Sequence, residues 1–297
     1  MNDYVIADLR IRIEATNSDL VSLGLKGFKP FEREPDANHA PDCIMTLDRS
    51  CSTEEFHINS VLSTFDFAEA EADCTLSATD TGHLFCIVRR AQPDAPIIFH
   101  KELASKHVTG NALCHAEVDL SLLRFGIWIM AGIAFIENDA IAIHSSTIVY
   151  RGGAVLFLGE SGTGKSTHTR LWREHIEGAR LLNDDSPVIR HIDGGSAVAY
   201  GSPWSGKTPC YKDEHYPIRA ICRLSQAPHN RIRRLSAIEA IGALLPSCPP
   251  AFAHDTALQD AICAIIGRVI SSVPIYRLEC LPDADAARLS CRTIFAE

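Results

Sequence analysis

The sequence of 297 residues lacks the cysteine spacing of a zinc site or a thioredoxin-like centre. Its 11 cysteines are scattered and none forms a CxxC pair, which argues against both kinds of motif. The first residues, Met1–Tyr4, have neither the basic region nor the apolar region of a secretory signal peptide. A chain of this size also buries a sufficient core without disulfides. We therefore expect reduced cysteines and a cytoplasmic protein.

Positive charge and long apolar runs are also scarce. Lys and Arg number 28 against 37 Asp and Glu, which gives a formal net charge of -9. A general nucleic-acid partner is not expected, because such binding rests on clustered basic side chains that face phosphates. The longest apolar run, residues 125–136, is shorter than the about 20 residues that span a bilayer. It predicts a buried helix and no membrane partner.

The first third of the chain has the alternation of half-buried β-strands. In residues 5–13 the odd positions are apolar, and this pattern predicts one strand with a polar face. Loops rich in Asp, Pro, Gly and Asn separate further short candidates. Further strands are expected at residues 44–47, 83–89, 96–100 and 112–118.

Strands and helices alternate in the rest of the chain. Asp119 is expected to cap a helix that runs to about Asn138. Other expected elements are a strand at 154–158, a hairpin of 188–192 and 197–200, helices that begin at Ser236, Thr256 and Asp283, and a strand at 274–281. The predicted fold class is α/β (α+β). We place a β-rich domain of unknown role at residues 1–115 and a second domain at residues 116–297.

One motif carries recognisable chemistry. Gly159–Ser166 reads Gly-Glu-Ser-Gly-Thr-Gly-Lys-Ser and matches GxxxxGK[ST] in full, between an expected strand and a helical stretch that ends near Gly178. Glycines allow successive N–H groups to turn inward around a polyphosphate. Lys165 supplies a catalytic cation for the β- and γ-phosphates, and the Ser166 hydroxyl suits Mg²⁺. The predicted cofactors are therefore ATP or another purine nucleotide and Mg²⁺.

The residues expected to bind the nucleotide are those of the loop and the start of the helix. They are Gly159, Ser161, Gly162, Thr163, Gly164, Lys165, Ser166 and Thr167.

A magnesium–nucleotide site also needs carboxylates. Asp184 and Asp185 end a short apolar run that is expected to form a neighbouring strand. Adjacent residues of a strand point to opposite faces, so one aspartate can bind the metal while the other has a different role. The segment Asp184–Pro187 is also a good turn sequence. Its pairing with the phosphate loop favours the functional interpretation.

The stretch from His144 to Asp185 resembles the HPr kinase/phosphorylase family, a branch of the phosphoenolpyruvate carboxykinase-like fold. Three pieces carry the resemblance in order: His144, the loop Gly159–Ser166, and the pair Asp184–Asp185. The resemblance covers about a third of the chain and excludes the first 115 residues. Thr167 stands where true HPr kinases usually have a glutamate.

The resemblance implies a P-loop carboxykinase-like second domain that transfers the γ-phosphoryl group of a nucleotide to a hydroxyl. In this reading Asp184 is the base toward the acceptor, Asp185 and Ser166 hold Mg²⁺, and His144 lies near the phosphates. The order of the two aspartates is open. The acceptor, a small molecule, a peptide or a protein serine, is open too, as is a homo-oligomer.

Two basic segments complete the candidate site. The loop Gly201–Lys207 is dense in turn-forming residues and could bring Lys207 toward the transferred phosphoryl group, or be a rigid loop with an exposed lysine. Arg231, Arg233 and Arg234 form the strongest basic cluster of an acidic chain. They are candidates for binding an anionic group of the acceptor or of the nucleotide, and a solvated strand face is the alternative.

The leading functional hypothesis is a kinase. One alternative is a nucleotide-binding switch with slow hydrolysis, whose N-terminal region binds a partner. The other is a carboxykinase-type reaction on an organic acid, although the sequence offers no obvious second metal cluster.

Overall fold

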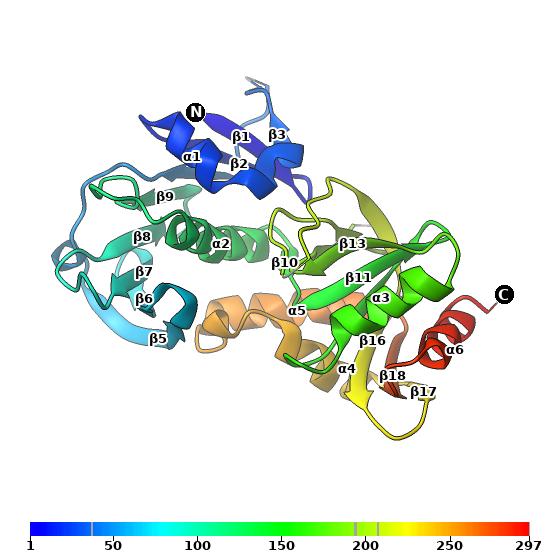
Figure 1. Ribbon diagram of the computed structural model, residues 1–297. Helices are drawn as coiled ribbons and strands as arrows, with labels where there is room; N and C mark the ends of the chain where they lie inside the picture. The colour runs from blue at the N-terminus through cyan, green and yellow to red at the C-terminus, as the bar shows by residue number, and fades with distance from the viewer. Residues whose placement is uncertain (37, 193–194, 207, 297) are drawn as a thin grey trace. The chain divides into compact units, whose positions relative to one another are not determined.

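The computed structural model describes residues 1–36, 38–192, 195–206 and 208–296 (Figure 1). Backbone contacts divide the chain into two compact units. Unit 1 comprises Met1–Asn138 and Ala251–Gln259, and unit 2 comprises Asp139–Pro250 and Asp260–Glu297. Both combine helices with a large sheet, which agrees with the predicted α+β class. The expected boundary near residue 115 precedes a helix that the contacts assign to unit 1.

Unit 1 is built on a sheet with the strand order β3-β1-β2-β4-β9-β8-β7-β6-β5. Its strands are β1 Asn2–Ile6, β2 Leu9–Glu14, β3 Glu32–Arg33, β4 Cys43–Thr46, β5 Ile58–Phe67, β6 Ala72–Thr79, β7 Gly82–Arg89, β8 Ile97–Glu102 and β9 His107–Gly110. Two α-helices of this unit are α1 Ser18–Gly24 and α2 Leu120–Glu137. Strands β4, β7 and β8 confirm three of the predicted strands.

Two strand predictions in unit 1 are wrong. Residues 5–13 do not form one strand, because Ala7 and Asp8 adopt positive φ angles of 54° and 63° and turn the chain into the β1–β2 hairpin. Both central residues of this tight turn are left-handed, as in a type I′ turn, where glycine or asparagine is usual. The strand predicted at residues 112–118 is also wrong, because residues 112–117 form turns and bends. The nearest strand is β9, which ends at Gly110.

Helix α2 is the buried helix that the apolar run predicts. The Asp119 side chain accepts hydrogen bonds from the backbone N–H groups of Ser121 and Leu122, as expected for the capping residue. The helix lies so close to the sheet that a Cβ on Gly126 would come within 2.1 Å of the Phe99 ring. Its length and apolarity would allow it to cross a membrane, but 67% of it is buried inside the protein.

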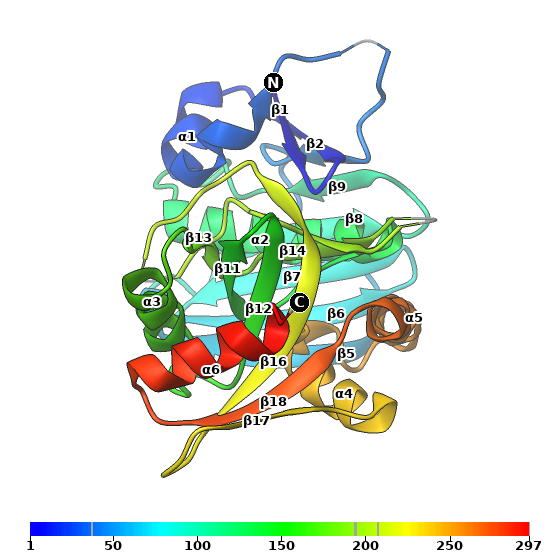
Figure 2. The ribbon, with the colours of Figure 1, turned by 90° about the vertical axis from the view of Figure 1, so that its right-hand side faces the viewer.

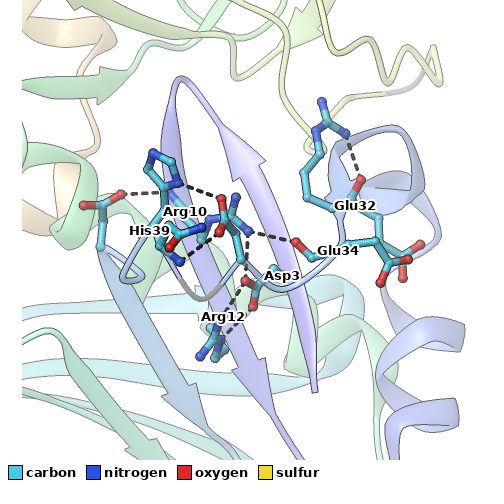
Figure 3. A network of polar contacts seen from close by, with 10 residues as sticks. Asp3, Arg10, Arg12, Glu32, Glu34 and His39 are labelled. Atoms are coloured by element: carbon cyan, nitrogen blue, oxygen red, sulfur yellow. Dashed lines mark hydrogen bonds and ion pairs between the residues drawn. The ribbon is translucent and has the colours of Figure 1, made fainter.

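Unit 1 also buries a carboxylate. Asp3 has a fully buried side chain that accepts hydrogen bonds from Arg12 at 2.7 Å and 3.0 Å and from Arg10 at 3.0 Å (Figure 3). Burial alone raises the pKa of Asp3, but the hydrogen bonds and charges of the two guanidiniums outweigh it and hold that pKa below its ordinary value. Arg10 also donates to the backbone carbonyl of Glu34. The network links β1, β2 and the segment after β3.

Unit 2 contains the strand order β10-β14-β15-β16-β12-β11-β13, with β18 on β16 and β17 on β18. These strands are β10 Ala140–Ala142, β11 Ser145–Tyr150, β12 Gly153–Leu158, β13 Arg180–Asp185, β14 Val188–His191, β15 Ala197–Tyr200, β16 His215–Gln226, β17 Arg231–Arg234 and β18 Ile275–Cys280. The remaining helices of the chain are α3 Lys165–His175, α4 Ala237–Leu244, α5 Thr256–Ser272 and α6 Ala284–Ile294.

The later sequence predictions agree with these elements. The hairpin is β14–β15, the late strand is β18, and Ser236 and Asp283 cap α4 and α6 with their side chains. The run that ends in Asp184 and Asp185 is strand β13, which pairs with β11 rather than with the strand before the loop.

Helices α3 and α6 share one face of the unit 2 sheet. Leu171 and Trp172 of α3 and Ile294 of α6 join a buried cluster with side chains of β12, β16 and β18. The Trp172 indole donates to the Ser290 hydroxyl of α6 at 2.9 Å, which ties the two helices together. Strands β12, β16 and β18 are parallel to one another, so their carboxyl ends lie at one edge of the sheet (Figure 2). The phosphate loop follows β12 at this edge, where ligands bind in α/β sheets.

Candidate functional site

The segment 159–164 joins β12 to α3 in the conformation that the motif predicts. Gly162 and Gly164 have φ angles of 80° and 105°, which side chains rarely adopt, and Gly164 directly precedes the first residue of α3. The Thr163 hydroxyl closes the loop by donating to the carbonyl of Glu160 at 2.7 Å. The loop therefore ends at the positive end of a helix, where phosphate oxygens find free N–H groups.

Lys165 reaches back over the loop. Its ammonium group donates to the carbonyl oxygens of Gly159 and Glu160, at 2.8 Å and 3.2 Å. Burial lowers the pKa of Lys165, and the charge of Arg223 acts in the same direction, whereas Asp185 and Asp184 oppose the shift. Neutral carbonyls are weak partners for an ammonium ion. Phosphate oxygens can therefore replace them at this position.

The three pieces of the predicted site meet in one cavity of about 390 Å³. Residues from the β10–β11 connection, the phosphate loop, the start of α3 and the end of β13 line it together. The lining residues that the sequence singled out are His144, Ser161, Gly162, Gly164, Lys165, Ser166, Thr167, Asp184 and Asp185. Side chains distant in sequence thus gather around one space.

Asp184 is the buried member of the pair. The hydroxyl of Ser146, on β11, donates to its carboxylate at 2.6 Å and lies 2.8 Å from the hydroxyl of Thr169 on α3. Asp184 faces Ser146 in the β11–β13 register, which explains the contact. Ser146 is a residue that sequence reasoning missed, because only the pairing of two strands 38 residues apart reveals it.

Asp185 is the more open member. Its side chain is 42% exposed, and its carboxylate lies 3.8 Å from the His144 imidazole. Burial raises the pKa of Asp185, although His144, Ser186 and Lys165 each lower it. Burial and the charge of Lys165 in turn lower the pKa of His144. At neutral pH the imidazole is therefore uncharged next to an aspartate that is more basic than usual.

A buried amide fixes the backbone around the aspartates. Asn183 accepts hydrogen bonds from the N–H groups of Asp185 and Ser186, and donates to Ser202 and to the carbonyl of Trp204. The loop that begins at Gly201 is thereby attached to the end of β13. Gly206 and Thr208 of this loop line the cavity. Lys207 itself lies outside the described residues, so its predicted role stays a prediction.

The basic cluster 231–234 is strand β17, with Arg231 and Arg233 on one side as expected for a strand. Arg233 forms two hydrogen bonds with the Glu239 carboxylate, at 2.7 Å and 3.2 Å, and lines a separate cavity of about 260 Å³. Arg231 and Arg234 are exposed. Their predicted contact with an anionic ligand stays a prediction.

A second, more apolar cavity of about 570 Å³ adjoins the phosphate loop. It shares Gly162, Gly164 and Thr167 with the first cavity. The rest of its lining comes from the loop, from α3, and from the carboxyl ends of β16 and β18 with the residues that follow them: Thr163, His168, Leu171, Leu224, Gln226, Ala227, Cys280, Leu281 and Pro282. Burial lowers the pKa of His168 to about 4, so this wall is uncharged at neutral pH.

The described residues contain no group of three or more His, Cys, Asp and Glu side chains placed to hold a metal ion. Mg²⁺ usually keeps several waters and takes one or two carboxylates plus substrate phosphates. The Ser166 hydroxyl and the two aspartates in one cavity fit that kind of site, in which the nucleotide itself supplies ligands.

No family model matches the chain, and neither does any curated protein. Among solved structures, the chain is similar to the Hpr(Ser) kinase/phosphatase from Coxiella burnetii, at 13% sequence identity and a TM-score of 0.31. The match covers 52% of this chain and 88% of that chain. A similarity of this size carries no argument about function, which rests on the geometry above.

Proposed function

We propose that the chain is a P-loop kinase of the phosphoenolpyruvate carboxykinase-like class, which transfers the γ-phosphoryl group of ATP to a hydroxyl acceptor with the help of Mg²⁺. The observation that carries this proposal is the single cavity that brings Lys165, Ser166, Asp184, Asp185 and His144 together. Phosphoryl transfer needs mainly positioning and neutralisation of charge. These side chains offer both.

The nucleotide would lie across the two adjoining cavities. Its phosphates fit the loop, where Lys165 would exchange the carbonyls of Gly159 and Glu160 for β- and γ-phosphate oxygens. Its nucleoside part fits the apolar cavity, which meets the first one at Thr167. Base and phosphates then lie on the two sides of the start of α3.

Mg²⁺ would supply a Lewis acid that neutralises charge on the phosphates. We assign Ser166 and Asp184 to hold it. Asp184 fits this role because the Ser146 hydroxyl fixes its carboxylate in one orientation. The two side chains that would hold the ion are positioned by β11, β13 and α3 together.

We assign Asp185 as the general base toward the acceptor hydroxyl. It is partly exposed, so an acceptor can reach it, and its raised pKa makes it the better proton acceptor of an aspartate pair. This order is the reverse of the one first taken from the resemblance. The imidazole of His144 lies 3.8 Å away and is neutral, so it would leave the charge of the carboxylate in place.

The proposal is tested by incubating the protein with γ-labelled ATP, Mg²⁺ and a panel of hydroxyl compounds, peptides and proteins. We expect label in an acceptor, and we expect Asp184→Asn to abolish the transfer while the variant stays folded. Release of free phosphate alone, at a rate that Asp184→Asn leaves unchanged, would refute the kinase and favour the switch.

A further inference from the structure

Three arginines from separate segments of unit 2 lie side by side on one sheet face. Arg223 of β16 faces Arg277 of β18 in the parallel pair, and Arg233 of β17 faces the same Arg277 in the antiparallel pair. Facing residues on neighbouring strands project from the same face, and like charges in such positions destabilise a sheet. We call these three residues the arginine row.

The face that carries the arginine row is the one opposite α3 and α6. Leu224 and Leu278, the next residues along β16 and β18, belong to the buried cluster under those helices. The Arg223 guanidinium instead donates to the carbonyl of Ala243 in α4 at 3.0 Å. The arginine row and the apolar cavity therefore flank the phosphate loop on different faces of the sheet.

Two members of the arginine row line a cavity together with residues of the phosphate loop. Arg223 and Arg277 line a cavity of about 460 Å³ together with Ser161 and Gly162. The last two residues also line the cavity of Lys165 and the two aspartates. All three arginines line the adjacent cavity of about 260 Å³. A molecule bound on the arginine row is thus next to the site of phosphoryl transfer.

The three arginines differ in how their charge is balanced. Arg233 is held by Glu239 through two hydrogen bonds. Arg223 has a carboxylate oxygen of Glu160 at 3.6 Å, and Arg277 has one of Glu279 at 3.9 Å, both beyond hydrogen-bond distance.

A guanidinium carries five N–H donors in a planar fork. Arg223 and Arg277 therefore keep donors for a ligand between them. Ser161, Ser225 and Gln226 add polar side chains to the same cavity.

We propose that Arg223 and Arg277 bind a phosphate monoester group carried by the acceptor. This inference rests on the proposed function, and it names the acceptor class as phosphorylated hydroxyl compounds. Two forks that line one cavity from neighbouring strands suit a tetrahedral dianion, and such charge-assisted pairs are strong. The bound anion also relieves the repulsion within the arginine row.

The test uses the full chain with its phosphate loop already occupied. The protein is first titrated with Mg²⁺ and the non-hydrolysable analogue adenylyl imidodiphosphate, and then, at saturation, with methyl phosphate in a calorimeter. We expect saturable binding of methyl phosphate, weakened about tenfold or more by Arg277→Gln, because a charge-assisted hydrogen bond is lost. Arg223→Gln is expected to have a similar effect.

Arg288→Gln is the matched control, because Arg288 is an exposed arginine of α6 that pairs with Asp285. It is expected to bind methyl phosphate as the wild type does. Thermal unfolding checks that Arg223→Gln, whose side chain is only 22% exposed, is folded. If Arg223→Gln is unfolded, the comparison of wild type with Arg277→Gln still decides the test.

Two results would overturn this inference and leave the proposed function standing. One is the absence of saturable methyl phosphate binding to the nucleotide-loaded wild type. The other is equal binding of methyl phosphate by the wild type and Arg277→Gln. If Arg277→Gln weakens binding of the nucleotide analogue but not of methyl phosphate, the arginines bind the nucleotide, and this result overturns the inference as well. Failure of the wild type to bind the analogue would refute the proposed function, and this inference with it.

Discussion

Lys101 in unit 1 is buried and Lys165 in unit 2 is half-buried, and their partners differ. The Lys101 side chain is 1% exposed, and its ammonium group contacts the Glu137 carboxylate at 2.9 Å and the carbonyls of Glu102 and Ser105. Lys165 donates to two carbonyls of a glycine loop, beside a cavity that holds two carboxylates. The Lys101 ammonium group already has a carboxylate and two carbonyls as partners. The Lys165 ammonium group can exchange its two carbonyls for phosphate oxygens.

The same contrast holds for the aspartates. Asp3 in unit 1 is enclosed by two guanidiniums that lower its pKa. Asp185 in unit 2 is half-exposed and has a raised pKa. Removing one member of a buried ion pair destabilises a fold, whereas charged groups with shifted pKa values around a cavity indicate chemistry. Substitutions of these groups in unit 1 should therefore change the free energy of unfolding, and those in unit 2 the rate of phosphoryl transfer.

The largest effect is expected for Asp185→Asn. Loss of the general base should lower the rate of phosphoryl transfer about 10³-fold, while the similar shape of asparagine preserves the fold. Transfer of label and the unfolding temperature are measured together. Asp285→Asn, at an exposed position of α6, should leave the rate unchanged. A rate for Asp185→Asn within tenfold of the wild type would contradict its role as base.

Asp3→Asn should act on stability instead. The variant leaves Arg10 and Arg12 without their buried partner, which should lower the free energy of unfolding by about 3 kcal/mol in urea titrations. Asp66→Asn, in the exposed pair with Arg90, should change stability little.

The effect of Asp3 should also depend on pH. Because the folded-state pKa of Asp3 is lowered, its stabilisation is complete above the ordinary aspartate pKa and is lost as the pH falls through the folded-state value. The difference between wild type and Asp3→Asn should shrink in acid. A constant difference down to low pH would refute the charged network.

Ser146→Ala should have a smaller effect on catalysis. It removes the hydrogen bond that orients Asp184, so we expect kcat to fall about tenfold with little change in KM for the acceptor. Steady-state kinetics at saturating Mg²⁺ separate the two constants. An unchanged kcat would show that this hydrogen bond does not position the carboxylate.

The smallest change is expected for His144→Gln. His144 is protonated only in acid, where its charge lowers the pKa of Asp185, so its removal should raise that pKa further. A base must be deprotonated, and the acidic limb of the kcat/KM profile should therefore move to higher pH. A limb that moves to lower pH would place His144 in another role.

Local patterns made most of the site predictable. The phosphate loop, the capping residues Ser236 and Asp283, and the strand before the loop each depend on neighbours in sequence, and the structure agrees with all of them. The hairpin at Ala7 and Asp8 was missed, because the apolar alternation of residues 5–13 continues through both residues and neither is a glycine.

Other features depend on strand register, which local sequence does not contain. Ser146 meets Asp184 through the β11–β13 pairing, and the arginine row needs three strands in register. The cluster 231–234 drew attention as a run of basic residues. Yet Arg233 is the one already paired with a carboxylate, and Arg223 and Arg277 were overlooked as single arginines in apolar strands.

The central claim is that the loop around Lys165 binds a magnesium nucleotide. Calorimetric titration of the wild type and of Lys165→Gln with Mg²⁺–ATP tests it most directly. We predict saturable binding to the wild type and an affinity about 100-fold lower for the folded variant, because the ammonium–phosphate contact is lost. No binding to the wild type, or equal affinities for the two proteins, would contradict the claim.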